Sequence, residues 1–116
     1  MVSVIKIDVY ERSFLLVYGG KKTWKKEMKK AGIWGQVSKQ IMHEKCDGCC
    51  VTNETEAYMF LSKGVSSGVI AHESFHMVAR LNDSIGGYLD SSSEENWAYM
   101  IGYIVDQVNG EIKKRE

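Results

Sequence analysis

The chain of 116 residues contains no proline, only three cysteines and no long hydrophobic run. A membrane-spanning helix needs about 18 or more consecutive apolar residues, so the lack of such a run argues against a membrane protein. Three cysteines cannot all pair within one chain, and a disulfide framework is not expected. The segment Met1 to Lys6 lacks the basic and long apolar regions of a signal peptide. We therefore expect a single domain over residues 1–116, with reduced thiols, in the cytoplasm.

The chain has no net charge, but its charges are unevenly distributed. Residues 1–50 contain ten Lys and Arg against five Asp and Glu, and residues 51–116 contain five against ten. Most of the basic excess lies between Lys21 and Lys30, where six lysines could attract phosphate or an acidic partner. Few apolar residues separate these lysines, and no series of aromatic residues is available for base stacking. A solvated helix face is therefore the better interpretation, and nucleic-acid binding is not expected.

The apolar patterning predicts an α+β domain in which paired N-terminal strands precede two apolar helices. Alternating β-branched residues predict a strand over Val2–Tyr10 and a second strand over Ser13–Tyr18, joined by a turn at Glu11-Arg12. Helical composition follows over Lys21–Lys30 and ends at Gly32. The later predicted elements are an edge strand over Glu56–Ser62, a helix over Val65–Leu81 and a last helix over Ser93–Lys113.

Between these elements, the segment Ile33–Asn53 is the hardest to interpret. It could hold a short strand or helix around Val37–Met42, followed by a loop over Cys46–Cys50. The last helix, by contrast, has a clear apolar stripe with spacings of three and four residues. The residues of this predicted buried face are Trp97, Ile101, Ile104, Val105, Val108 and Ile112.

One motif carries most of the chemical information: His72-Glu73-Ser74-Phe75-His76, an HExxH pattern within an apolar segment. Residues four apart share a helix face, so His72 and His76 can offer two imidazole nitrogens to one Zn²⁺. Glu73 lies about 100° further around the helix, where it can contact a metal-bound water instead of the metal. The helix is apolar nearly all round, which predicts a central buried helix. Buried histidines are costly without a ligand, which favours a metal site over two core histidines bonded to backbone.

A catalytic zinc needs three protein ligands and one open position. His43 lies upstream of the motif, and the downstream continuation that would supply a third histidine is absent. The start of the last helix offers Glu94 and Glu95, which could reach the metal if the two helices pack antiparallel. Glu94 is in line with the hydrophobic face. Glu95 precedes Ala98 and Gly102, whose small size would let the motif helix approach closely. Either glutamate could instead belong to a capping box, so the pattern alone leaves the choice open.

These two segments resemble the gluzincin branch of zinc metallopeptidases, in which HExxH is completed by a glutamate in an E-x-x-A context. The matching residues here are Ala71-His72-Glu73-Ser74-Phe75-His76 and Glu95-Asn96-Trp97-Ala98-Tyr99. More closely, the chain resembles small metallopeptidases encoded by phages and prophages, whose HExxH helix is followed by an "EP-AY-GY" helix. Asn96 stands where that last motif usually has proline. The resemblance implies a zincin-like domain with zinc bound by His72, His76 and Glu95, and with Glu73 as general base.

The activity implied by this resemblance is hydrolysis of a peptide or protein substrate. Zinc would lower the pKa of its bound water to about 7, and Glu73 would pass the water's proton to the leaving amine. Tyr88, Tyr99 or Tyr103 could help to stabilise the oxyanion, and an extended substrate could add to the strand Glu56–Ser62. The alternative is a catalytically silent protein of zincin fold that keeps the metal site and acts as a binding or host-interaction module.

A second group of candidate ligands consists of His43, Cys46, Cys49 and Cys50. Cys-x-x-Cys spacing suits thiolate coordination, and His43 could be a fourth ligand. Zinc ribbons normally pair two such knuckles, however, and only one is present. We therefore favour incidental reduced thiols over a small structural metal site, and either of these over a redox-sensitive pair.

Overall fold

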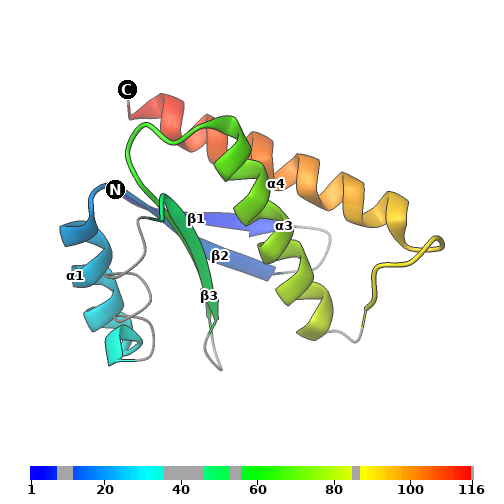
Figure 1. The fold of residues 1–116 in the computed structure, drawn as a ribbon, viewed down its shortest axis with the longest axis horizontal. Helices are drawn as coiled ribbons and strands as arrows, with labels where there is room; N and C mark the ends of the chain where they lie inside the picture. Colours follow the sequence, from blue (N-terminus) through cyan, green and yellow to red (C-terminus); the bar gives the residue numbers. More distant parts are fainter. Residues whose placement is uncertain (8–11, 36–45, 53–55, 85–86, 116) are drawn as a thin grey trace.

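The structure, a computed structural model, describes residues 1–7, 12–35, 46–52, 56–84 and 87–115. These residues form an α+β fold with one mixed four-stranded sheet and three helices, as the sequence predicts (Figure 1). The elements are β1 (Val2–Ile7), β2 (Arg12–Tyr18), α1 (Lys21–Ala31), β3 (Gly48–Thr52), β4 (Ala57–Leu61), α3 (Ser67–Ser84) and α4 (Glu94–Lys114). No helix among the described residues combines the length and the apolar character needed to cross a bilayer.

The strands lie in the order β1-β2-β4-β3. β1 is antiparallel to β2, β2 is parallel to β4, and β3 is antiparallel to β4. β4 is therefore an interior strand, and all five of its residues are buried. The prediction that Glu56–Ser62 is an edge strand is wrong, because β3 pairs along the outer side of β4.

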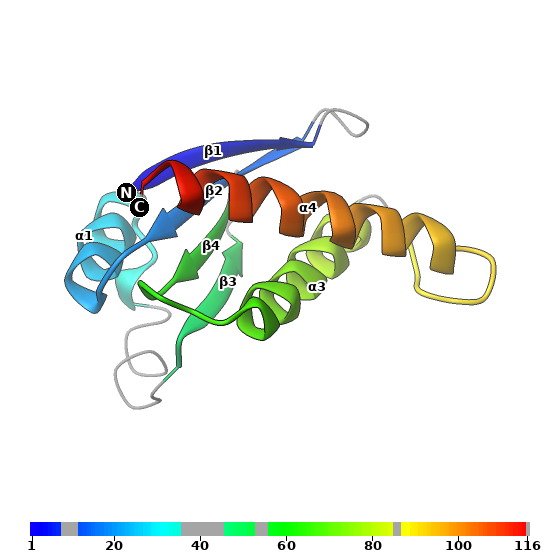
Figure 2. The ribbon, with the colours of Figure 1, turned by 90° about the horizontal axis from the view of Figure 1, so that it is seen from above.

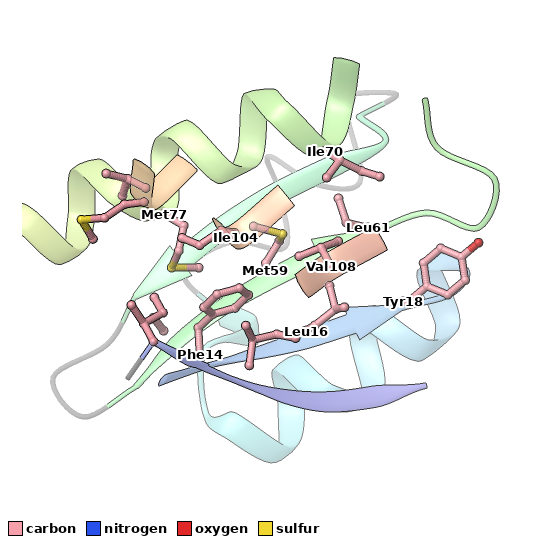
Figure 3. Close-up of a cluster of buried hydrophobic side chains, with 14 of the residues drawn as sticks. Phe14, Leu16, Tyr18, Met59, Leu61, Ile70, Met77, Ile104 and Val108 are labelled. Carbon is pink, nitrogen blue, oxygen red and sulfur yellow. The ribbon is translucent and has the colours of Figure 1, made fainter. Parts of the chain in front are cut away.

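Helices cover both faces of the sheet (Figure 2). α3 and α4 lie on one face, and the larger core between them and the sheet includes Phe14, Met59 and Ile104 (Figure 3). α1 lies on the other face, where Trp24 and Phe60 belong to a smaller core. Because side chains alternate along a strand, the neighbours Met59 and Phe60 of β4 enter different cores. The sheet is thus buried on both sides around β4.

The N-terminal elements follow the predicted pattern closely. β1 ends at Ile7, and residues 8–10 of the predicted strand lie outside the described residues. β2 begins one residue earlier than expected, at Arg12. α1 ends at Ala31, and its C-cap Gly32 adopts φ 75° in the left-handed region that glycine tolerates best. The element predicted around Val37–Met42 lies outside the described residues.

α3 differs from its prediction in burial more than in length. Ile70, Ser74, Met77 and Val78 face the core, whereas Phe75 and its neighbours on the opposite face are exposed. The prediction of a helix buried nearly all round is wrong, because α4 packs on the sheet beside α3 and leaves its outer face to solvent (Figure 2). The apolar residues of this segment therefore do not all serve the core.

In α4 the predicted stripe is buried at Trp97, Ile104, Val108 and Ile112, with Met100 in addition. Ile101 and Val105, also predicted for this face, are only partly buried and pack at its margin.

Candidate metal centre

Three residues in the middle of α3 form the candidate metal centre. His72, Glu73 and His76 offer ligand atoms that all lie within 4.8 Å of one another. The Nε2 atoms of His72 and His76 are 3.1 Å apart. Two Zn–N bonds of about 2.05 Å that meet near the tetrahedral angle place their nitrogens about 3.3 Å apart. The two rings are therefore arranged at nearly the separation that one zinc ion requires.

The same distance also allows one ring to donate a hydrogen bond to the other, depending on the tautomers. Both histidines are exposed, so neither ring is forced into this geometry by the core. The argument from the cost of burying histidines, which supported a metal site in the sequence, therefore does not apply. The support for a metal now comes from the convergence of the ring nitrogens.

Glu73 occupies a different environment from the two histidines. Its exposed fraction is 5%, and its side chain lies on the side of α3 that faces β3. A Cβ atom at Gly48 would lie only 2.9 Å from Glu73 Cγ. The Cys50 Sγ lies 3.1 Å from the backbone oxygen of Glu73 and donates a hydrogen bond to it. The beginning of β3 thus packs against α3 and encloses the Glu73 side chain, while the two imidazoles face solvent.

An open pocket of about 410 Å³ adjoins this centre. It lies between the beginning of β3 and the beginning of α3. Volumes of roughly 300–1,000 Å³ are typical of small-ligand sites. The residues that line it are Asp47, Gly48, Ser66, Gly68, Val69, His72 and Glu73. A candidate ligand and the largely buried candidate base therefore both border a pocket that opens to solvent.

β3 has no partner on its outer side among the described strands. The Ser62 N–H donates to the Asp47 C=O, which identifies Asp47 and Ser62 as a hydrogen-bonded pair of the β3–β4 ladder. Because such pairs alternate along an antiparallel ladder, Gly48 and Cys50 direct their backbone N–H and C=O groups away from β4. Within the described part of the chain, the outer edge of β3 is therefore unpaired, and it runs beside the candidate metal centre.

Phe75 connects the centre with α4. Its ring centroid lies 6.2 Å from that of His76 and 5.7 Å from that of Trp97. Phe75 keeps an exposed fraction of 42% despite these contacts. The first turns of α4 are thus held next to the exposed face of α3, close to where the sequence places its third ligand.

Glu94 and Glu95 lie in the first turn of α4 and are both exposed. Neither belongs to the group of ligand atoms within 4.8 Å in the described structure. Gly102 is exposed with no atom within 4 Å of an added Cβ, so the prediction that small residues on this face admit α3 is wrong. Ser93 is the N-cap and makes no side-chain capping bond. The structure brings together His72, Glu73 and His76, and Glu95 as third ligand stays a prediction.

The three tyrosines considered for the oxyanion do not line the pocket. Tyr88 and Tyr99 are 78% and 72% exposed, and the Tyr103 hydroxyl donates to the backbone oxygen of Lys6 on β1.

The cysteines are free thiols, and two of them lie on β3 in place of the predicted loop. Cys49 and Cys50 are neighbours on a strand, so they face opposite sides of the sheet and cannot converge on one ion with Cys46. Burial, followed by the charges of Cys46 and Glu73, raises the pKa of Cys49 to about 12. Burial, followed by the Glu73 charge, also raises the pKa of Cys50. Because the three thiols do not face one point, incidental reduced thiols remain favoured. His43 lies outside the described residues.

The sequence reasoning missed Gly48 and Cys50 as neighbours of Glu73. The signal for a strand was present in the β-favouring Val51-Thr52 that follows them, but the pairing with β4 is not a local property. Comparisons of the chain with known protein families, with curated proteins and with solved structures found no match.

Proposed function

We propose that the chain is a zinc-dependent hydrolase that cleaves peptide bonds, with His72 and His76 as ligands and Glu73 as general base. The observation that supports this best is the 3.1 Å separation of the two Nε2 atoms. Imidazole nitrogens suit zinc among the divalent metals. The resemblance to gluzincin-type metallopeptidases adds Glu95 as the third ligand and peptide hydrolysis as the reaction.

A zinc ion held by these residues supplies Lewis-acid activation of water near neutral pH. Glu73, enclosed between α3 and β3, accepts a proton from the attacking water and returns it to the leaving amine. The two exposed imidazoles leave the outer side of the centre open to a substrate carbonyl. The division between buried base and exposed ligands therefore suits a site that meets its substrate from solvent.

The free edge of β3 is the proposed binding strand for an extended substrate. Gly48, one of its residues with outward backbone groups, lines the pocket together with His72 and Glu73. This assignment replaces the segment Glu56–Ser62, because β4 has strands on both sides. A side chain of the bound peptide would occupy the pocket.

The test is cleavage of a peptide library by zinc-loaded wild-type protein and by Glu73→Gln. Glutamine cannot accept the proton, so we expect activity to fall by about 10²- to 10⁴-fold with zinc still bound. Glu94→Gln, which changes an exposed glutamate of α4, is the matched control and should cleave like the wild type. Equal cleavage by Glu73→Gln and wild type would contradict the proposal.

A second candidate function is a metal-keeping binding module. Exposed apolar residues at Tyr88, Leu89 and Tyr99, around the start of α4, support it, because such groups often mark contact surfaces. The experiment separates the two candidates. A module of this kind would bind zinc, cleave no peptide and keep its function in Glu73→Gln.

A further inference from the structure

We propose that the Cys50 thiol is a positioning residue that holds Glu73 in place for proton transfer. The proposal rests on the proposed function in one respect, the role of Glu73 as base. It gives a function to part of the cysteine group that the metal centre does not use.

The first step is the hydrogen bond from Cys50 Sγ to the backbone oxygen of Glu73, 3.1 Å long. In an α-helix this carbonyl also accepts the N–H four residues further on, and a carbonyl oxygen has lone pairs for both donors. The thiol therefore adds a bond between the sheet and the helix without breaking the helix ladder. It fixes the position of α3 along β3 at the residue that carries the base.

The second step is the close approach at Gly48, two residues before Cys50 on the same face of β3. An added Cβ there would lie 2.9 Å from Glu73 Cγ and 3.1 Å from Val69 Cγ1. Glycine thus allows the Glu73 side chain to lie directly against the strand. The close packing at Gly48 restricts the Glu73 side chain, and the Cys50 thiol restricts the Glu73 backbone.

Cys49 provides a matched comparison within the same strand. It is also partly buried, but it packs against the core on the α1 side of the sheet. No hydrogen bond from its thiol to Glu73 is found among the described contacts, in contrast to Cys50. Substitution of Cys49 therefore removes a thiol but keeps the hydrogen bond from Cys50 to the backbone oxygen of Glu73.

The experiment compares kcat and KM of zinc-loaded wild type, Cys50→Ala, Cys50→Val, Cys50→Ser and Cys49→Ala. The alanine and valine variants lack a donor, and valine avoids a cavity, so we expect both to lower kcat by about 10-fold or more with little change in KM. Cys50→Ser keeps a donor and should restore most of kcat. Cys49→Ala should match the wild type.

A second readout does not require turnover. In the cobalt-loaded protein, the pH midpoint of the change in visible absorption reports the groups that exchange protons beside the metal. Glu73→Gln sets the shift for complete loss of the base. We expect Cys50→Val and Cys50→Ala to shift the midpoint in the same direction, and Cys50→Ser and Cys49→Ala to leave it unchanged.

The outcomes distinguish the inference from the proposed function. If the wild type cleaves nothing but the Cys50 variants shift the midpoint, the hydrolase proposal fails and the positioning role stands. If Glu73→Gln shifts the midpoint and the Cys50 variants do not, the positioning role is overturned. It is also overturned if Glu73→Gln itself has no effect on the midpoint.

Discussion

The proposed roles of the three site residues depend on which side of α3 each one occupies. These residues are His72, Glu73 and His76. The i and i+4 spacing of the histidines was readable from the sequence because helix geometry alone fixes it. Their exposure was not readable, because it depends on where α4 packs. Glu73 faces β3, and its partner Cys50 is 23 residues away along the chain. The local motif was therefore predictable, and the residues that surround its base were not.

The third ligand is tested by comparing two neighbouring glutamates. If Glu95 binds zinc, Glu95→Ala should weaken zinc affinity by more than about 10-fold. Loss of a direct ligand should cost at least as much as loss of a residue that only hydrogen-bonds to a ligand. Glu94→Ala should leave the affinity within about 2-fold of the wild type. Competition with a chromophoric chelator measures both. Equal affinities of the two variants would refute Glu95 as the ligand.

The close approach at Gly48 predicts a loss of stability on substitution. In Gly48→Ala the new methyl group meets the side chains of Glu73, Leu61 and Val69 at about 3 Å, and such overpacking costs about 1–3 kcal/mol. Urea unfolding measures the change in the free energy of unfolding. Gly102→Ala on α4 is the control, because the added Cβ meets nothing within 4 Å and should stabilise by about 0.5–1 kcal/mol. Equal stability of Gly48→Ala and wild type would argue against the close packing of α3 on β3.

Among the elements, β3 has the largest influence on the interpretation of the site. Sequence reasoning assigned the first three residues of β3 to a loop, because a glycine and two adjacent cysteines give only a weak strand signal. Its assignment as a strand depends on pairing with β4, and the edge position depends on the order of the whole sheet. Longer elements with clear periodicity, such as α1 and α4, were predicted to within a few residues. Pairing between distant segments is what the sequence pattern could not supply.

The raised pKa of the Cys49 thiol predicts how the stability of the protein depends on pH. The pKa of this thiol is about 12 in the folded protein and 9.0 in its ordinary state, so the unfolded chain loses this proton first. The stabilisation from the protonated thiol is complete below about pH 9 and is lost as pH rises toward about 12. Cys49→Val has no such proton, so its urea midpoint should fall less than that of the wild type between about pH 8 and about pH 10.5. A parallel fall in both proteins would contradict the raised pKa.

In the whole molecule, the sheet separates the lysine-rich helix α1 from the candidate metal centre. α1 covers one face, and α3 and α4 cover the other (Figure 1). Lys22, Lys25 and Lys29 are exposed, whereas the Lys21 ammonium donates to the Cys46 carbonyl and lies 3.7 Å from the centroid of the Trp24 ring. The basic segment thus contains one lysine that connects α1 to the start of β3. The fold class followed from composition and periodicity, while this contact required the folded arrangement.

We propose that the metal is held by the histidines of α3 and not by the cysteines. X-ray absorption at the zinc edge, with one equivalent of zinc per chain, distinguishes these two sets of ligands. We expect a first shell of nitrogen and oxygen at about 2.0–2.1 Å with the outer-shell scattering of two imidazoles, and we expect His72→Ala to lose this two-imidazole signal. A sulfur shell at about 2.3 Å, unchanged in His72→Ala, would contradict it.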